Sequence, residues 1–218
     1  MNPERLNLTA GSYDDIAAEY AHQLYRELDS KPMDRATLDR FADRLRGRGT
    51  VCDMGCGPGH VGRYLADRGL DVIGVDLSPG MVAQAAALNP DIAFHQGNIL
   101  AMDWPDDSWA GIAAFYSIIH IPRDAIFAAL NEMRRVLRPG GSLLLAFHTG
   151  DADLRETEVW GISIDLEYTM YGAVEMTDNL RAVGFEIVEV TEREPYAPDI
   201  EYQSRRAYIL ARKPEKFG

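Results

Sequence analysis

A glycine-rich run and an acid downstream of it are the residues best suited to hold a ligand. The run reads Asp53-Met54-Gly55-Cys56-Gly57-Pro58-Gly59 and lies between a short apolar segment and a helical pattern. Glycines let the backbone approach a ligand closely and let the turn aim N–H groups at it. Asp76 stands at the expected end of the next strand, where a carboxylate can accept hydrogen bonds from both ribose hydroxyls. Together they predict a nucleoside-containing cofactor.

The sixth position of this loop bears on which cofactor it holds. A dinucleotide fingerprint places glycine there, whereas this chain has His60. A pyrophosphate cradle is therefore disfavoured, and a nicotinamide-dependent oxidoreductase remains the alternative enzyme. The structural alternative is that the glycines only make tight turns and that Asp76 only caps a neighbouring segment.

The chain from about Tyr13 to Arg212 resembles the class I S-adenosylmethionine-dependent methyltransferases, and within them the small-molecule methyltransferase domains of quinone biosynthesis. The resemblance implies that the matched loop holds the methionine end of the cofactor through Asp53, Gly55, Gly57 and Gly59. It also implies that Asp76 takes the ribose and that Leu77 and Met81 flank the adenine.

Two further segments carry the resemblance. Gly97-Asn98-Ile99 stands where the family usually has Gly-Asp, whose acid accepts from the adenine amino group; the amide oxygen of Asn98 can accept the same bond. Residues 137–145 match the family's turn into the fifth strand. Ala110 departs from a common Asp, which affects the start of the fourth strand and not the chemistry.

The residues after the fourth strand are the candidates for chemistry. Methyl transfer is an in-line displacement that needs mainly proximity, orientation and exclusion of water, so a base is optional. Phe115 and Tyr116 are expected to line the methionine pocket, and Tyr116 is also a candidate catalytic residue. His120 is the first candidate for a general base, because its reference pKa lies near neutrality. Equally, His120 could only cap a helix or bond a loop. His148 is a weaker candidate, and His95 is expected to be structural.

Aromatic residues in two other segments could complete the site. Tyr13 and Tyr20 resemble the amino-terminal segment that covers the cofactor in relatives, and their ring faces could stabilise a cation, although Tyr20 could also be core. Trp160, Tyr168 and Tyr171 could wall a substrate pocket or pack a dimer interface.

The elements that must position these residues alternate from residue 50 onward. Two helical patterns come first, within residues 1–48, and form an expected helical cover. Strands then alternate with helices, which predicts a parallel sheet. The predicted segments are strand 50–53, helix 60–68, strand 72–76, helix 79–88, strand 92–95, strand 111–116, a helix from 126 to 137 and strand 142–147 after Pro139-Gly140-Gly141.

The alternation breaks after the fifth strand. Residues 149–172 are predicted to be a lid insertion with one half-buried strand, Ser163–Tyr171, because polar and apolar residues alternate there. A helix capped near Thr177 or Asp178 then ends at Gly184. Strands 185–190 and 207–211 have no helix between them and are expected to form a hairpin. The fold expected is a doubly wound, Rossmann-like, seven-stranded sheet with an antiparallel last strand, in one domain spanning 1–218.

The amino-acid composition limits the classes of partner that the protein is expected to bind. The net charge is −12, from 22 Lys and Arg against 34 Asp and Glu, which disfavours nucleic acid and anionic membranes. No signal peptide or membrane span is apparent, so a cytoplasmic monomer or homodimer is expected. Cys52 and Cys56 show no metal-site spacing and are interpreted as free thiols, with oxidation between them left open.

The sequence thus predicts an enzyme that transfers a methyl group from S-adenosylmethionine to a small-molecule acceptor, without a metal. A protein that binds this cofactor without catalysis is the alternative from another functional class.

Overall fold

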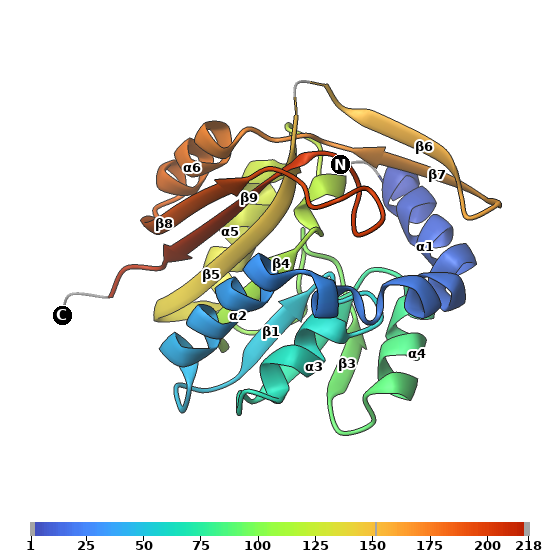
Figure 1. Ribbon diagram of the computed structural model, residues 1–218. Helices are drawn as coiled ribbons and strands as arrows, with labels where there is room; N and C mark the ends of the chain where they lie inside the picture. Colours follow the sequence, from blue (N-terminus) through green and yellow to red (C-terminus); the bar gives the residue numbers. More distant parts are fainter. Residues whose placement is uncertain (1–2, 151, 216–218) are drawn as a thin grey trace.

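The protein is built around a seven-stranded sheet, seen in the computed structural model, which describes residues 3–150 and 152–215 (Figure 1). In chain order its strands are β1 (Val51–Met54), β2 (Val72–Asp76), β3 (Ala93–Gln96), β4 (Trp109–Phe115), β5 (Leu137–Thr149), β8 (Glu186–Arg193) and β9 (Arg205–Arg212). Their order across the sheet is β3-β2-β1-β4-β5-β9-β8. β1 to β5 pair in parallel, and β9 runs antiparallel to both β5 and β8. The predicted fold class is confirmed.

Helices cover both faces of this sheet, because its central strands β1 and β4 are buried along their whole length. α2 (Pro32–Leu45) and α3 (His60–Ala66) pack on one face through Phe41, Leu45 and Leu65. α5 (Ile126–Val136) and α6 (Ala173–Ala182) pack on the other. The sheet is thus a rigid platform whose carboxyl edge is left for loops.

Helix α1 (Pro3–Leu24) and a separate hairpin lie over that edge (Figure 1). The hairpin consists of β6 (Leu154–Val159) and β7 (Ile162–Tyr168), and β7 packs along α1. α1 also packs on α4 (Pro79–Leu88). The helical cover expected over residues 1–48 therefore divides: α1 covers the strand ends, whereas α2 belongs to the core of the sheet.

Polar contacts hold α1 in this place. Asp14 Oδ1 accepts hydrogen bonds from Ser78 Oγ at 2.5 Å and from the Gly80 N–H at 2.7 Å, at the start of α4. The Ser12 hydroxyl contacts both backbone groups of Asp165 on β7. These bonds join the glycine-rich edge, α1 and the hairpin into one assembly.

The lid contains two strands where the sequence predicted one. The predicted alternation on β7 is confirmed, with Ile164 and Leu166 buried. β6 was missed because its residues are mostly charged and exposed, so they show no apolar alternation. Trp160 and Gly161 form the turn between the strands, with φ of 52° and 78°, as a two-residue hairpin requires.

Two predicted boundaries are wrong. α6 begins at Ala173, not near Thr177, because the Glu175 carboxylate accepts the Gly172 N–H at 3.3 Å and starts the helix four residues earlier. β5 begins at Leu137, directly after α5, because Leu137 pairs with Trp109 and the chain around Gly140 bonds to Lys213. No helix in the described part of the chain is long and apolar enough to cross a bilayer.

Gly111 tests the packing of α2 on the sheet. A Cβ at this position would lie 2.3 Å from Leu45 Cδ1 and 3.1 Å from Phe41 Cζ. Gly111→Ala should therefore lower the free energy of unfolding by about 1–3 kcal/mol in urea titrations. The matched control is Gly11→Ala in α1, where nothing lies within 4 Å and a gain of roughly 0.5–1 kcal/mol is expected. Equal stability of the two variants would contradict this packing.

Candidate active site

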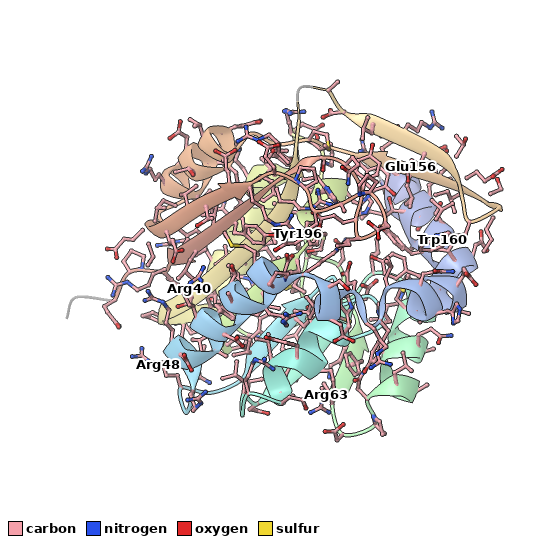
Figure 2. All side chains as sticks on the ribbon, in the orientation of Figure 1. Arg40, Arg48, Arg63, Glu156, Trp160 and Tyr196 are labelled. Atoms are coloured by element: carbon pink, nitrogen blue, oxygen red, sulfur yellow. The ribbon has the colours of Figure 1, made fainter. Side chains whose placement is uncertain are left out.

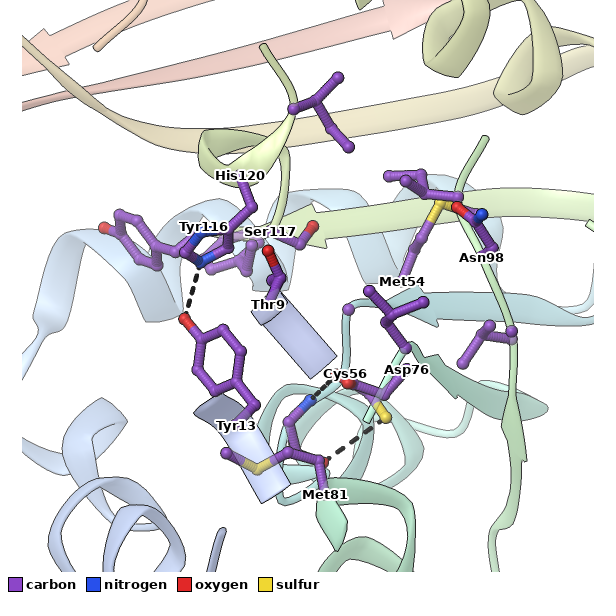
Figure 3. Close-up of a pocket in the computed structure, with 18 of the residues that line it drawn as sticks. Thr9, Tyr13, Met54, Cys56, Asp76, Met81, Asn98, Tyr116, Ser117 and His120 are labelled. Atoms are coloured by element: carbon purple, nitrogen blue, oxygen red, sulfur yellow. Dashed lines mark hydrogen bonds between the residues drawn. The ribbon is translucent and has the colours of Figure 1, made fainter. Parts of the chain in front are cut away.

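A cavity opens at the carboxyl edge of β1, β2 and β4, beneath α1 (Figure 3). Most of the predicted site residues line it: Tyr13, Tyr20, Gly55, Gly57, Asp76, Leu77, Met81, Gly97, Asn98, Ile99, Phe115, Tyr116 and His120. We call it the first cavity. Their positions agree with the predicted binding role, which itself stays a prediction.

The Asp76 carboxylate holds the glycine loop in shape. Its Oδ2 accepts the Gly57 N–H at 2.8 Å, and its Oδ1 accepts the Ser78 N–H at 2.9 Å. Burial raises the pKa of Asp76, while these backbone donors oppose the rise. Each oxygen retains lone-pair capacity towards the cavity, so the carboxylate can still accept from a diol.

Glycine at position 55 is required by both conformation and space. Its φ is +69°, and a Cβ there would lie 2.2 Å from Ser117 Cβ. The loop can therefore pass close under the start of the segment after β4. Ser117 lines this cavity, and its buried Oγ has no hydrogen-bond partner among the described residues.

Asp53 and Gly59 lie outside the cavity lining, in contrast to their predicted contact with the cofactor. The buried Asp53 carboxylate accepts the Gly62 N–H at 2.7 Å, beneath the loop, and burial raises its pKa to about 7. Gly59 precedes α3 with φ of +81° and packs against Asn89 and Phe94. Both residues support the loop from behind.

At the other end of the cavity, Leu77, Met81 and Ile99 provide apolar walls. Asn98 lies beside them, and its Oδ1 accepts the Leu100 N–H at 2.9 Å. A flat heterocycle fits between such walls, with the remaining polar capacity of Asn98 at its edge. The departure from the family's Asp at this position therefore leaves a polar group in place.

His120 is bonded at both ring nitrogens. Nδ1 lies 3.1 Å from the carbonyl oxygen of Glu167 on the hairpin, and Nε2 lies 2.7 Å from the Tyr13 hydroxyl (Figure 3). A carbonyl can only accept, so Nδ1 carries the hydrogen and Nε2 accepts from Tyr13. Burial lowers the pKa of His120 to about 4. This geometry favours the alternative in which His120 bonds a loop over the one in which it acts as the base.

Tyr116 ends β4 in a left-handed conformation, with φ of 55°. This backbone turn aims its ring between the sheet and α2, where its hydroxyl donates to Asp34 Oδ1 at 3.0 Å. Burial raises the pKa of Tyr116. The hydroxyl thus stays protonated, and the ring serves as a wall and not as a base.

Sequence reasoning missed a polar group at the methionine end of the expected site. Glu27 lines the first cavity, accepts from His60 Nε2 at 2.9 Å and pairs with Lys31 at 2.5 Å. Burial opposes its ionisation, but the bond from His60 and the charge of Lys31 lower the pKa of Glu27 to about 2. Only His60 had a sequence signal, as the loop's sixth residue; Glu27 had none.

A second cavity, of about 600 Å³, adjoins the first beneath the hairpin. Tyr13, Tyr20, Glu27 and Tyr116 line both cavities and form the wall between them. Trp160 and Tyr168 line the second cavity, as expected of a substrate pocket. Tyr171 does not: it is fully buried in the main core and donates to the Ile121 carbonyl, so it walls neither a pocket nor an interface.

His148 and His95, the other two histidines considered from the sequence, lie away from the first cavity that His120 lines. His148 lines the second cavity, with Nδ1 2.7 Å from Ser204 Oγ, and burial lowers its pKa to about 3. His95 is exposed and packs edge-on against Trp104, outside both cavities, which agrees with a structural role. The low pKa of His148 means that its ring is not poised to be protonated near neutral pH.

The protonation of His120 can be measured directly. Its ring should remain neutral, as the Nδ1–H tautomer, down to about pH 5 in nitrogen NMR spectra. In the unfolded chain the reference pKa is about 6.5. Between pH 6.5 and 4 the unfolded state therefore binds a proton that the native state does not, so His120 contributes a loss of stability as pH falls. Titration of the native ring near pH 6.5 would contradict the buried, doubly bonded geometry.

Comparison with known proteins agrees with this site. Residues 51–141, from β1 into the start of β5, match a family model described as a methyltransferase domain. A demethylmenaquinone methyltransferase of Beutenbergia cavernae is 37% identical over 141 residues, covering 63% of this chain and 56% of the relative. A malonyl-[acyl-carrier protein] O-methyltransferase of Enterobacter lignolyticus is 34% identical over 157 residues, covering 70% of this chain and 57% of the relative. The chain thus spans little more than half the length of these relatives.

Solved structures share the fold. A DhpI–SAH complex superposes with a TM-score of 0.75 at 24% identity and covers 100% of both chains. A methyltransferase of Methanosarcina mazei superposes with a TM-score of 0.69 at 18% identity and covers 77% of this chain and 93% of its own. The matched segment contains the glycine loop, Asp76 and Asn98, and the surrounding sheet has the same architecture. The chain therefore contains a methyltransferase domain over residues 51–141, within a fold that it shares with a solved S-adenosylmethionine-dependent methyltransferase.

Proposed function

We propose that the protein transfers a methyl group from S-adenosylmethionine to a small-molecule acceptor, with the donor in the first cavity and the acceptor in the second. The observation that carries this proposal is the shared wall: two adjoining cavities at the carboxyl edge of the sheet meet at Tyr13, Tyr20 and Tyr116. Such an arrangement suits a reaction between two bound molecules. The activities in the relatives' names, on quinones and a malonyl thioester carrier, support a methyl acceptor of this kind.

The residues of the first cavity fit the donor. Asp76 would accept from the ribose hydroxyls, and Leu77, Met81 and Ile99 would enclose the adenine with Asn98 at its edge. The N–H groups of the glycine loop and the unpartnered Ser117 hydroxyl would face the methionine end. The close approach at Gly55 leaves no space for a side chain, as a backbone cradle requires.

The bound donor supplies a methyl group on a positively charged sulfur. The chain's own contribution is to orient and enclose the reactants. Tyr13 and Tyr20 line the shared wall, where the quadrupole of an aromatic ring can stabilise a cation. α1 and the hairpin exclude water from above. Since His120 donates to a carbonyl and accepts from Tyr13, we propose that it orients Tyr13 and does not remove a proton.

Replacement of Asp76 tests the donor site. Asp76→Asn keeps one acceptor oxygen but removes the charge, so S-adenosylmethionine affinity should fall roughly tenfold to a hundredfold in calorimetry, or about 1.5–3 kcal/mol. The control is Asp91→Asn, an exposed acid paired with Arg63 on the surface. Wild-type affinity in a folded Asp76→Asn variant, or micromolar binding of NAD in place of the methyl donor, would contradict the proposal.

Trp160 tests the acceptor compartment. Its ring packs edge-on against Tyr20, with centroids 5.9 Å apart, at the mouth of the second cavity. Trp160→Ala should change acceptor selectivity in a methyl-transfer screen and leave donor affinity within about twofold. Phe127→Ala on α5, a similarly exposed aromatic (45% against 43%), should change neither. Equal loss of donor and acceptor binding would assign Trp160 a structural role instead.

A further inference from the structure

The second cavity has an uneven charge that points to the chemistry of its occupant. Its hairpin side carries one acid, Glu156 of β6, which lines the cavity and is labelled in Figure 2. Glu156 is half-buried and accepts from the Tyr168 hydroxyl at 3.1 Å. Within residues 3–150 and 152–215 no Lys, Arg or His forms an ion pair with it. Its negative charge is therefore available to a ligand.

The cations of the same cavity are already engaged. Lys31 is buried and pairs with Glu27 at 2.5 Å, with Glu201 3.9 Å away. Arg206 is 1% exposed; its guanidinium donates to the Tyr202 carbonyl at 2.8 Å and lies 3.4 Å from Glu201. Neither group offers an unpaired positive charge to an acidic ligand.

A third cation, Arg193, lies behind the lining of the cavity and pairs with one of its acids. Arg193 lies between Glu201 and Asp34, forming ion pairs at 2.5 and 3.0 Å. The three cations Lys31, Arg193 and Arg206 thus face the three acids Glu27, Asp34 and Glu201. Within the lining itself, Lys31 and Arg206 balance Glu27 and Glu201, so Glu156 sets the net charge of the compartment.

Aromatic rings surround the space in front of Glu156. Tyr13, Tyr20, Tyr116, Trp160, Tyr168 and Tyr202 all line the cavity. Ring faces attract cations, and a carboxylate placed among such rings strengthens that attraction in a partly desolvated site. Burial first, and then the charge of Glu156, raise the pKa of Tyr168. The pKa of Tyr13 on the shared wall is raised mainly by burial, then by Tyr168, Tyr20 and Asp76, and also by Glu156. The electrostatic field of Glu156 therefore reaches the donor side.

We infer that the second cavity selects an acceptor that carries a basic amine on an aromatic or apolar body, with Glu156 as the carboxylate that binds the ammonium group. This inference rests on the proposed function, because it assigns a substrate class to the acceptor compartment. It concerns recognition: the ammonium group orients the acceptor, whichever of its atoms receives the methyl group. Leu154, Val159 and Leu166 of the hairpin supply the apolar contacts for the body of the molecule.

The test compares ligands that differ in charge but share a ring. Calorimetry on the protein loaded with S-adenosylhomocysteine would use tyramine, 4-ethylphenol and 4-hydroxyphenylacetate, and a second series of tryptamine, 3-ethylindole and indole-3-acetate. At least one amine should bind roughly tenfold to a hundredfold more tightly than its neutral and acidic counterparts, as expected for a charge-assisted bond. No preference for the amine in either series, or a preference for the acids, would overturn the inference.

Two variants assign the preference to one carboxylate. Glu156→Gln keeps an oxygen for the Tyr168 hydroxyl and should abolish the preference while S-adenosylhomocysteine still binds as in the wild type. Glu158→Gln removes the same charge from an exposed position on β6 outside both cavities. This variant should keep the preference for the amine. A preference that survives Glu156→Gln would overturn the assignment. Failure of the wild type to bind S-adenosylhomocysteine would instead refute the proposed function, so the two failures are distinguishable.

Discussion

The buried carboxylate of Asp76 is the constraint on which the site depends. It lies where the loop after β1 meets the turn after β2, and it accepts one backbone N–H from each. A buried charge is tolerated only with such donors, so the carboxylate and the loop conformation stabilise each other. Glycine at positions 55 and 57 follows from this, because both residues have positive φ in the shape that Asp76 holds.

The cover over this edge is built from two segments far apart in the sequence. Asp14 joins α1 to the start of α4, and His120 joins Tyr13 of α1 to the hairpin backbone. A single imidazole therefore links the sheet edge, the amino-terminal helix and the lid. Its low pKa suits this role, since a neutral ring can donate to the carbonyl and accept from the hydroxyl at the same time.

The division into two compartments explains how the same edge can hold two reactants. The tyrosines of the shared wall belong to α1 and to the end of β4, so the rigid sheet and the cover each contribute one side. Trp160 at the hairpin tip packs against Tyr20, so the hairpin and α1 meet at the second cavity. Specificity for the acceptor can thus vary in the hairpin without altering the donor cradle.

Much of this was predictable from the sequence, because alternating strands and helices and the glycine loop are local signals. The strands β2 and β7 and the positions of Asp76, Tyr13 and His120 at the cavity followed from such patterns. Asp53 was misplaced because a motif does not reveal which carboxylate faces inward. Glu27 and Glu156 were missed because their importance depends on partners far away in the chain or on the absence of a cation nearby, which no local pattern encodes.

The most direct test of the account is a crystal structure with S-adenosylhomocysteine bound. The account predicts the ribose hydroxyls on the Asp76 carboxylate, the adenine between Leu77, Met81 and Ile99, and the sulfur at the wall of Tyr20 and Tyr116, facing the second cavity. A nucleoside bound elsewhere, or a sulfur turned away from that wall, would contradict the two-compartment mechanism.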